Sequence, residues 1–342
     1  MPTTSTLAVS ELDFDTIKSS LQTYLKGQTE FSDYDFESST LSILLNVLSY
    51  NTYHNSFYLN MIANEMFLDS AQLRNSVVSR AKMLNYTPRS ARGATAAVDT
   101  IVTPGDSPTS ITVAANTQFT STVNGISYIY VTSQSTSLIS QPNGTFTGTL
   151  NIVEGTPLQH RFTVNTTNPV RYILPNENTD TTSFTVRIQE STSNTSVITY
   201  SLLSDLSSVN SISTIYYLQE NEDNLYEVYF GDDVFGKKPI NGNIVLIDYR
   251  VCNGTATNGA NTFATPDSLG GYSNFTTTTS SVAQGGALQE TIDSIKYNAP
   301  FKYQAQDRLV TMQDYKNIIL SENGDLSSIN VWGGEENDPP IY

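Results

Sequence analysis

The chain has 342 residues, with 33 acidic and 17 basic side chains and a formal net charge of −16. Because phosphate contact requires clustered Lys and Arg, and no basic block occurs, this balance argues against binding to nucleic acid or to an anionic membrane. The length exceeds that of one ordinary domain, and the single cysteine, Cys252, excludes an intrachain disulfide.

Neither a secretory signal nor a membrane span is expected. The first residues, MPTTSTLAVSELDF, contain no basic segment followed by an apolar one. No run approaches the roughly 18 apolar residues that cross a bilayer. We therefore expect a soluble protein made in a cytoplasm.

The residues from about 11 to 86 predict helices. In the first helix, apolar side chains recur at helical spacing: Phe14, Ile17, Leu21, Tyr24 and Leu25. Asp13 or Asp15 is expected to cap its start, and Gly27 its end.

A longer second helix is expected after a cap at Ser38 or Ser39. One face of it is traced by Leu41, Leu44, Leu45, Leu48, Thr52, Asn55, Leu59, Ile62 and Met66. A third helix is expected over residues 70–85, and Pro88 stops it.

The second helix has an unusual composition beside its apolar stripe. The stretch SYNTYHNSFYLNMIANEMF is rich in Asn, Tyr and Met, whereas a surface helix of a monomer normally carries charges on its outer face. Either a second face meets another protein, or the helix is packed between two elements of its own chain. The sequence leaves both readings open.

Residues from 94 to about 279 predict β-structure. Short β-branched or alternating runs, such as SITVAANTQFT and SYIYVTS, are separated by Gly, Pro, Asn and Asp turns. Their spacing favours sandwich-like or barrel-like domains. No repeat of fixed period indicates a solenoid or propeller.

Helices are expected again after this region. The stretch QGGALQETIDSIKYNAP predicts one helix, with Leu288, Ile292 and Ile295 aligned, that Pro300 ends. A second helix is expected between an N-cap at Thr311 and a C-cap at Gly324. SSINVWGG then predicts a strand.

These elements together predict an α+β fold. We expect a helical bundle segment over residues 1–92, and antiparallel β-domains over 93–210 and 211–283. A small helical or α+β region is expected over 284–342, continuing beyond the chain end.

One segment, Glu227 to Phe263, resembles the signature of the J-like baseplate proteins of contractile tails. In that signature a strand ends in F-G-D-G, a Gly-Pro turn follows, and a strand of the form V-x-V-x-Y-R leads to a Gly/Asn-rich turn. The matching residues are Phe230, Gly231, Asp232, Gly236, Pro239, Gly242, Tyr249, Arg250, Gly254 and Gly259. Asp233 departs from the commoner Gly, which makes the turn less permissive.

Two further segments carry the same resemblance. One is similar to the family's A-P…R-A-V-T-x-x-D-Y helix, at Ala299, Pro300, Arg308, Val310, Thr311, Asp314 and Tyr315. The N-terminal helical block is similar to the amino-terminal region of the T-even-type baseplate wedge proteins of the inner ring.

The residues of these motifs have a physical reading of their own. Gly231 and Gly236 are expected in tight turns that other residues do not adopt. Thr311 with Asp314 approximates a capping box. Both motifs therefore determine the fold first, and no catalytic role is assigned to them.

The resemblance implies a structural wedge subunit in the virion's tail baseplate. In that family, subunits form a ring around the tail tube, pair with a second copy, bundle helices with a larger wedge partner, and rearrange when the sheath contracts. By analogy, partner binding is expected over residues 11–86. The expected contacts are Leu41, Leu45, Leu48, Tyr58, Leu59 and Met66.

Side chains for catalysis or metal binding are scarce. His54 and His160 are expected to be structural or surface residues, and Cys252 a small core residue. Asp232 and Asp233 could be read as metal ligands or an acid/base pair, but adjacent residues on a strand point to opposite faces and would not converge. Turn capping is the preferred interpretation. Glu335, Glu336 and Asp338 resemble a solvated loop. We expect no enzyme activity, metal or cofactor.

Two other function classes compete with this prediction. The Tyr/Asn/Thr-rich β-region could belong to a receptor-binding or carbohydrate-binding protein of the tail tip. Paired carboxylates would be needed for a glycan-degrading enzyme, and no such pair stands out from the turns.

Overall fold

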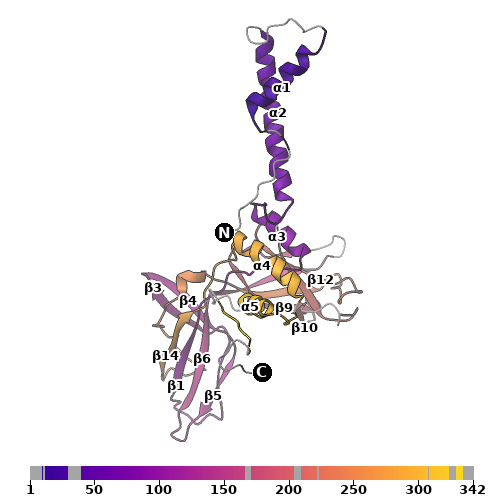
Figure 1. The fold of residues 1–342 in the computed structure, drawn as a ribbon. Coiled ribbons are helices and arrows are strands. Elements are labelled where there is room, and N and C mark those ends of the chain that lie inside the picture. Colours follow the sequence, from indigo (N-terminus) through magenta and orange to yellow (C-terminus); the bar gives the residue numbers. More distant parts are fainter. Residues whose placement is uncertain are drawn as a thin grey trace. The chain divides into compact units, whose positions relative to one another are not determined.

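The computed structural model describes residue 10 and residues 12–29, 40–165, 171–203, 209–221, 223–306, 308–322 and 329–333. The chain divides into two compact units, which we describe separately (Figure 1). The helical unit combines Met1–Tyr86 with Ile292–Tyr303, and the β-unit combines Thr87–Thr291 with Gln304–Tyr342. The predicted α+β fold is confirmed.

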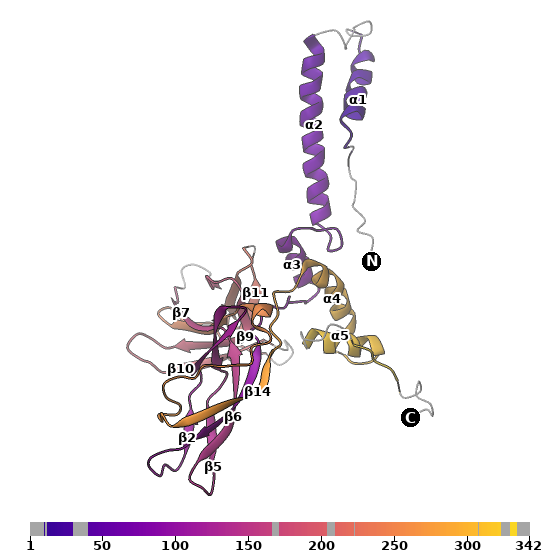
Figure 2. The ribbon, with the colours of Figure 1, turned by 90° about the vertical axis from the view of Figure 1, so that its left-hand side faces the viewer.

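The helical unit begins with an antiparallel pair, α1 (Phe14–Lys26) and α2 (Thr40–Glu65), as Figure 2 shows. Asp13 caps α1, because its Oδ1 accepts the backbone N–H of Thr16 at 2.7 Å. Gly27 is the C-cap, as predicted, but it keeps a right-handed φ of −77°. The predicted caps of α2 at residues 38 and 39 lie outside the described residues.

A small core joins α3 (Arg74–Met83) to α4 (Ile292–Ala305). It contains Ala71, Val77, Val78, Ala81, Tyr86, Ile295 and Ala299. Lys296 also donates its ammonium to the carbonyl of Asp69 at 3.0 Å. Residues distant in sequence thus complete one helical unit.

The predicted limits of α4 were wrong at both ends. Pro300 lies inside the helix, which continues to Ala305, and Leu288 precedes the helix and is exposed. A proline in a helix removes one backbone hydrogen bond. Here the burial of Ile295 and Ala299 against α3 holds the helix despite that loss.

In the described part of the β-unit, the first sheet has seven strands, in the order β14-β1-β6-β4-β3, with β2 and β5 beside this path. Their bounds are β1 (Thr95–Val102), β2 (Ile111–Val113), β3 (Gln118–Val123), β4 (Ile126–Thr132), β5 (Thr136–Ser140), β6 (Phe146–Glu154) and β14 (Phe275–Gln284). Alternate residues of these strands form a core that includes Val98, Phe119, Tyr130 and Leu150.

The second sheet, over the same described part, also has seven strands, in the order β7-β13-β9-β10-β11-β12-β8. Their bounds are β7 (Thr156–Thr163), β8 (Tyr172–Ile173), β9 (Thr179–Gln189), β10 (Val197–Leu202), β11 (Ile215–Glu220), β12 (Tyr226–Phe230) and β13 (Ile244–Val251). Neighbouring strands are antiparallel except β10 and β11, which are parallel. The core includes Val186, Ile188, Val245, Ile247 and Tyr249.

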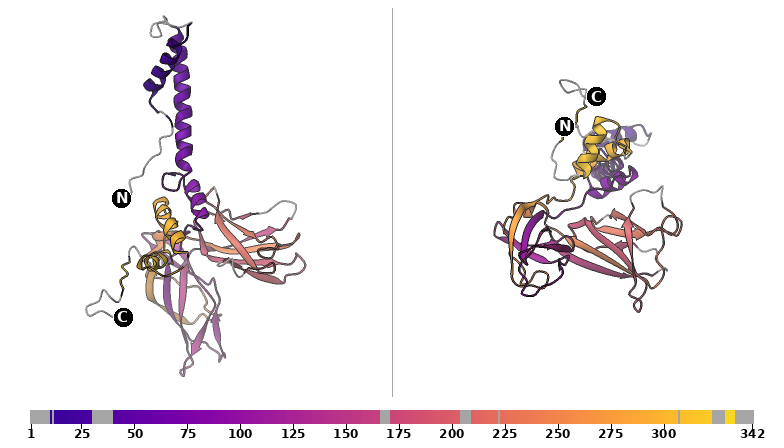
Figure 3. Two further views of the ribbon diagram at one scale, coloured as in Figure 1. Left: turned by 45° about the vertical axis from the view of Figure 1, so that its right-hand side comes forward. Right: turned by 90° about the horizontal axis from the view of Figure 1, so that it is seen from below.

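The two sheets lie side by side, and the chain crosses between them without a long linker (Figure 3). The chain passes from β6 to β7 at Gly155, and β14 returns to the first sheet after β13. Asn210, near which we placed a domain boundary, lies between β10 and β11 of a single sheet. Pairing between strands, which a linear sequence does not display, keeps that sheet continuous.

Buried Glu154 lies where the chain crosses between the two sheets and links them by hydrogen bonds. Its carboxylate accepts the side-chain amide of Asn253 at 2.7 Å and the backbone N–H of Asn253 at 3.1 Å. Burial raises the pKa of Glu154, and the donated hydrogen bonds from Asn253 oppose that shift. An acidic group is thus held in the interior mainly by neutral donors.

The C-terminal helix, α5 (Met312–Glu322), begins with the predicted capping box. The backbone N–H of Asp314 donates to Thr311 Oγ1 at 3.2 Å, and the N–H of Thr311 donates to Asp314 Oδ2 at 2.8 Å. The predicted C-cap at position 324 lies outside the described residues. The strand expected over 327–334 is absent from its described part, residues 329–333, where no neighbouring strand pairs with it.

Candidate partner-binding helix

Helix α2 carries almost no charge. Of its 26 residues, Glu65 alone is acidic or basic. A helix with one face in water normally places charged side chains on that face. Its surface is therefore unlike that of an ordinary solvent-exposed helix.

The side of α2 that its own chain covers is short and mostly polar. Leu45, Ser49 and Asn60 are buried there, at 2%, 0% and 5% exposure. At about 100° per residue these positions share one side of the helix, which faces α1. Ile17 is the buried residue of α1. The intrachain contact thus uses little of the apolar surface of α2.

The opposite side of α2 is exposed and mostly apolar, with the hydrogen-bonded pair Asn51 and Asn55 as its polar part. We call it the apolar face of α2; its ten apolar side chains have exposed fractions between 44% and 66%. They are Ile43, Leu44, Val47, Leu48, Tyr50, Phe57, Tyr58, Leu59, Met61 and Ile62. Together they span roughly 200° of the helix circumference at about 100° per residue. A surface of this kind marks an interaction site in a soluble protein.

Aromatic rings cluster at the middle of this face. The ring of His54 lies 4.3 Å from Tyr50, 5.7 Å from Tyr53 and 6.4 Å from Tyr58, measured between ring centroids. Tyr side chains offer a large apolar body with one polar tip, and they are enriched at protein interfaces. His54 thus has the structural role expected of it, within an aromatic group.

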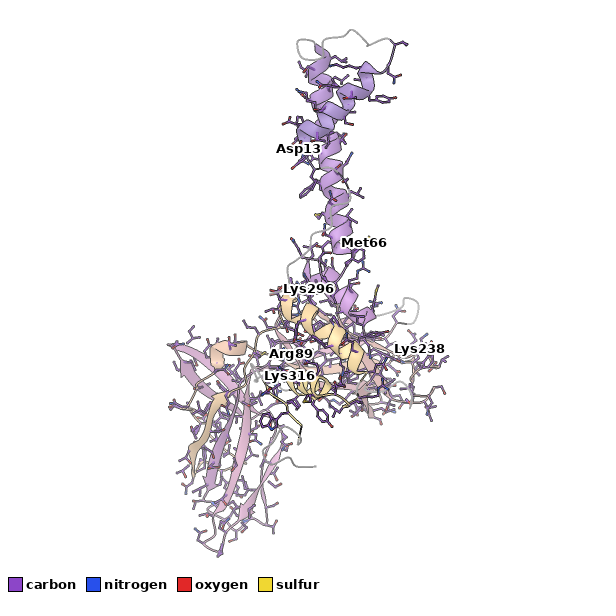
Figure 4. All side chains as sticks on the ribbon, in the orientation of Figure 1. Asp13, Met66, Arg89, Lys238, Lys296 and Lys316 are labelled. Carbon is purple, nitrogen blue, oxygen red and sulfur yellow. The ribbon has the colours of Figure 1, made fainter. Side chains whose placement is uncertain are left out.

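The structure separates the six predicted contact residues into two groups. Leu48, Tyr58 and Leu59 belong to the apolar face, and exposed Met66 lies just past the end of α2 (Figure 4). Leu41 is half-buried, and Leu45 is buried by its own chain. Leu45 therefore supports the helical pair and is not available to a partner here.

Sequence reasoning missed several members of the apolar face. Four of them lie about a quarter-turn or more around the helix from the centre of the predicted stripe: Ile43, Val47, Phe57 and Met61. Charged residues usually mark the solvent side of a helix, and α2 has none before Glu65. The unbroken apolar composition was the available signal, because it indicates a helix to be covered on most sides.

The signature residues of the β-unit form a closed turn after β12. Asp232 Oδ1 accepts the backbone N–H groups of Val234 and Phe235, both at 3.0 Å, and these bonds lower the pKa of Asp232. Asp233 Oδ1 accepts the N–H of Lys238 at 2.9 Å. Turn capping by both aspartates is therefore confirmed.

The glycines of this turn are required for different reasons. Gly236 has a φ of +91°, which other residues rarely adopt. A Cβ on Gly231 would lie 2.2 Å from the carbonyl oxygens of Phe235 and Gly236, so close backbone approach excludes a side chain there. Asp233, where the family commonly has Gly, has a φ of +70°.

The other signature residues also stabilise the fold. Tyr249 donates its hydroxyl to Asn176 Oδ1 at 2.5 Å, and Arg250 lies 3.7 Å from the carboxylate of Asp180. Phe230 packs against the core of the second sheet, and Pro239 is buried. Tyr315 is exposed on α5. Apart from Tyr315, these positions have roles within the chain.

Among the described residues, no cluster of three or more His, Cys, Asp or Glu side chains could hold a metal ion. None of the helices in the described ranges is long and apolar enough to cross a membrane. Cys252 is buried, and burial raises the pKa of its thiol to about 12. The predicted acidic loop at positions 335, 336 and 338 lies outside the described residues.

Comparison with known proteins bears on the same helices. Residues 13–86 match the family model described as "Baseplate wedge protein gp6-like, helical domain". The chain is 28% identical over 341 aligned residues to "Baseplate wedge protein gp6" of Enterobacteria phage T4, covering 92% of this chain and 50% of that protein. The chain thus spans about half the length of this relative. The predicted resemblance to wedge proteins of the T-even type is confirmed.

A solved structure was also matched, the cryo-EM structure of the anti-feeding prophage (AFP) baseplate, 6-fold symmetrised. The match covers 94% of this chain and 67% of that one, at 12% identity and a TM-score of 0.32.

Proposed function

We propose that this chain is a structural subunit of the baseplate wedge of a contractile tail, and that other baseplate proteins cover the apolar face of α2. The observation that carries this proposal is a helix with Glu65 as its one charged residue and ten large apolar side chains exposed to water, within the region that matches the wedge helical domain. Burial of such side chains releases about 25 cal/mol per Å² of apolar surface, which favours assembly.

The apolar face is wide enough for two partner helices to pack on it. One helix packed on another typically covers a stripe a little over 100° wide. The apolar face spans roughly twice that angle, and α1 already occupies the opposite side. A second copy of this chain and a larger wedge protein are the partners we propose for these positions.

The remainder of the chain supports a role in spacing and connection. The β-unit contains two sheets held by buried cores and by a turn whose geometry comes from Asp and Gly residues within the chain. We assign it no catalytic role, since its signature residues are occupied in structural contacts. The protein then acts in the virion's tail baseplate, and its helical contacts rearrange when the sheath contracts.

Co-purification with the other wedge proteins tests this function. The variant Leu44→Asp/Ile62→Asp places charges on the apolar face without touching the buried side of α2. We expect it to fold and to lose co-purification, because an unpaired charge is costly to bury. Ser19→Asp/Ser20→Asp, at two exposed positions of α1, is the charge-matched control. Unchanged assembly of the double variant would contradict the proposal.

A further inference from the structure

A cavity of about 490 Å³ lies in the β-unit, away from α2. Its floor is the outer face of the second sheet, opposite the core side, where three adjacent strands, β7, β13 and β9, lie side by side. Turns of the first sheet contribute Ala115, Asn116 and Ser133 to its wall. Its volume falls in the range of small-molecule sites, about 300–1,000 Å³.

Alternating residues place polar side chains together on this floor. Ser183, Thr185 and Arg187 follow one another at every second position of β9, and Asp248 and Arg250 do so on β13. Gln159 of β7 is paired in register with Asp248. The floor therefore presents two guanidinium groups and one carboxylate.

The carboxylate of the floor is fully engaged. Asp248 Oδ1 accepts the side-chain amide of Gln159 at 2.6 Å, and its Oδ2 is paired with Arg187 Nη2. Arg250 is 3.7 Å from Asp180, which is buried and does not line the cavity. Both arginines consequently keep donor groups that these carboxylates do not use.

Two buried donor atoms without partners agree with these unused donor groups. The Nε atoms of Arg187 and Arg250 are buried and have no hydrogen-bond partner among the described residues. A buried donor without a partner is costly, and a guanidinium group satisfies its donors best with the paired oxygens of a carboxylate or phosphate. Asn116 and Gln159 line the cavity and are exposed, so solutes reach it.

We propose that this cavity binds an oxyanion, a carboxylate or a phosphate, through Arg187 and Arg250. The oxyanion comes either from a small anion in solution or from an acidic side chain of a neighbouring protein. Since the site lies in the β-unit, it does not depend on the apolar face of α2.

Isothermal titration calorimetry of the full chain with citrate, inorganic phosphate and hexaglutamate, at constant ionic strength, tests this site. We expect saturable binding of at least one probe, weakened at least about tenfold by Arg187→Gln. Lys238→Gln, at an exposed position of the turn after β12 and outside the cavity, is the control and leaves the affinity within about twofold. Binding of citrate or phosphate indicates a small anion, whereas binding of hexaglutamate alone indicates a protein carboxylate.

Asp248→Asn separates ligand binding from a merely structural role. The change removes the carboxylate that competes for Arg187, so we expect tighter binding of the same probe, by about threefold or more. Arg187→Lys keeps the charge and serves if Arg187→Gln does not fold; we expect an intermediate affinity. Absence of saturable binding for every probe, or equal losses of affinity in Arg187→Gln and Lys238→Gln, would overturn the inference.

Discussion

Asn60 of α2 makes a two-sided hydrogen bond with Ser10, fifty residues earlier in the chain. Its Nδ2 donates to the carbonyl of Ser10 at 3.2 Å, and its Oδ1 accepts the backbone N–H of Ser10 at 3.3 Å. A polar pair at a helical contact specifies one register, because every other register leaves a buried polar group unmatched. Ser10 is thereby fixed against α2.

Loss of this pair should loosen the helical unit. We expect Asn60→Ala to destabilise the docking of Ser10 on α2 by about 1 kcal/mol, the usual net worth of a hydrogen bond. The backbone amides of Ser10 and of α1 should then exchange with deuterium about fivefold faster. Asn46→Ala, at an exposed position of α2, is the control. Equal exchange rates in the two variants would contradict the assigned role of Asn60.

Leu45 and Leu48 should respond differently to the same substitution. Leu45→Asp buries a charge against α1 and should cost about 3 kcal/mol or more, so that helical circular dichroism falls. Leu48 is exposed, so Leu48→Asp should leave the helical circular dichroism unchanged and the free energy of unfolding within about 0.5 kcal/mol of the native value. A similar loss of helicity in both variants would show that the apolar face is covered by the chain itself.

Glu154 should make the β-unit less stable as the pH rises. Its folded-state pKa is raised by burial, so its contribution is fully present below the unfolded pKa of about 4.5 and is lost as the pH rises through the raised value. Glu154→Gln removes this titration while keeping an oxygen that can accept from Asn253. We expect urea unfolding to show the variant gaining stability, relative to the native chain, between pH 4 and pH 7. A stability difference that is independent of pH would contradict this assignment.

The closed turn after β12 should not tolerate a side chain at Gly231. A methyl group there meets two carbonyl oxygens at 2.2 Å, so we expect Gly231→Ala to cost at least ~2 kcal/mol in urea unfolding. Gly105→Ala is the control, because nothing lies within 4 Å of a Cβ there. Equal stability of the two variants would show that the turn relaxes easily.

Local signals predicted the elements whose cause is local. The cap at Asp13, the capping box of Thr311 with Asp314, and the turn bonds of Asp232 follow from side chains a few residues from their partners. Pro300 inside α4 was missed, because packing of Ala299 on α3 outweighs a local breaker. Contacts between distant residues decide such cases.

Long-range strand pairing and the orientation of α2 were also beyond local signals. β14 pairs directly with β1, with Val102 opposite Phe275, although the strands of the second sheet lie between them in the sequence. The sequence indicated that α2 is apolar on more than one side, but it gave no charged residue to mark which side faces α1. The polar pair of Asn60 with Ser10 decides that question, and its two members are fifty residues apart.

The central claim is that other proteins cover the apolar face of α2 in the assembled baseplate. Ile62→Cys should react rapidly with a maleimide in the isolated chain, since Ile62 is exposed. The native Cys252 is buried, and the raised pKa of about 12 of its thiol keeps it unreactive near neutral pH. Thr109→Cys, at an exposed position of the β-unit, is the control.

The decisive measurement is the rate of maleimide labelling of Ile62→Cys in the free chain and in assembled baseplates. We predict that assembly slows labelling at position 62 at least about tenfold relative to position 109, because partner helices exclude solvent from the apolar face. Equal labelling of the two positions in assembled baseplates, with Ile62→Cys still incorporated, would contradict the account.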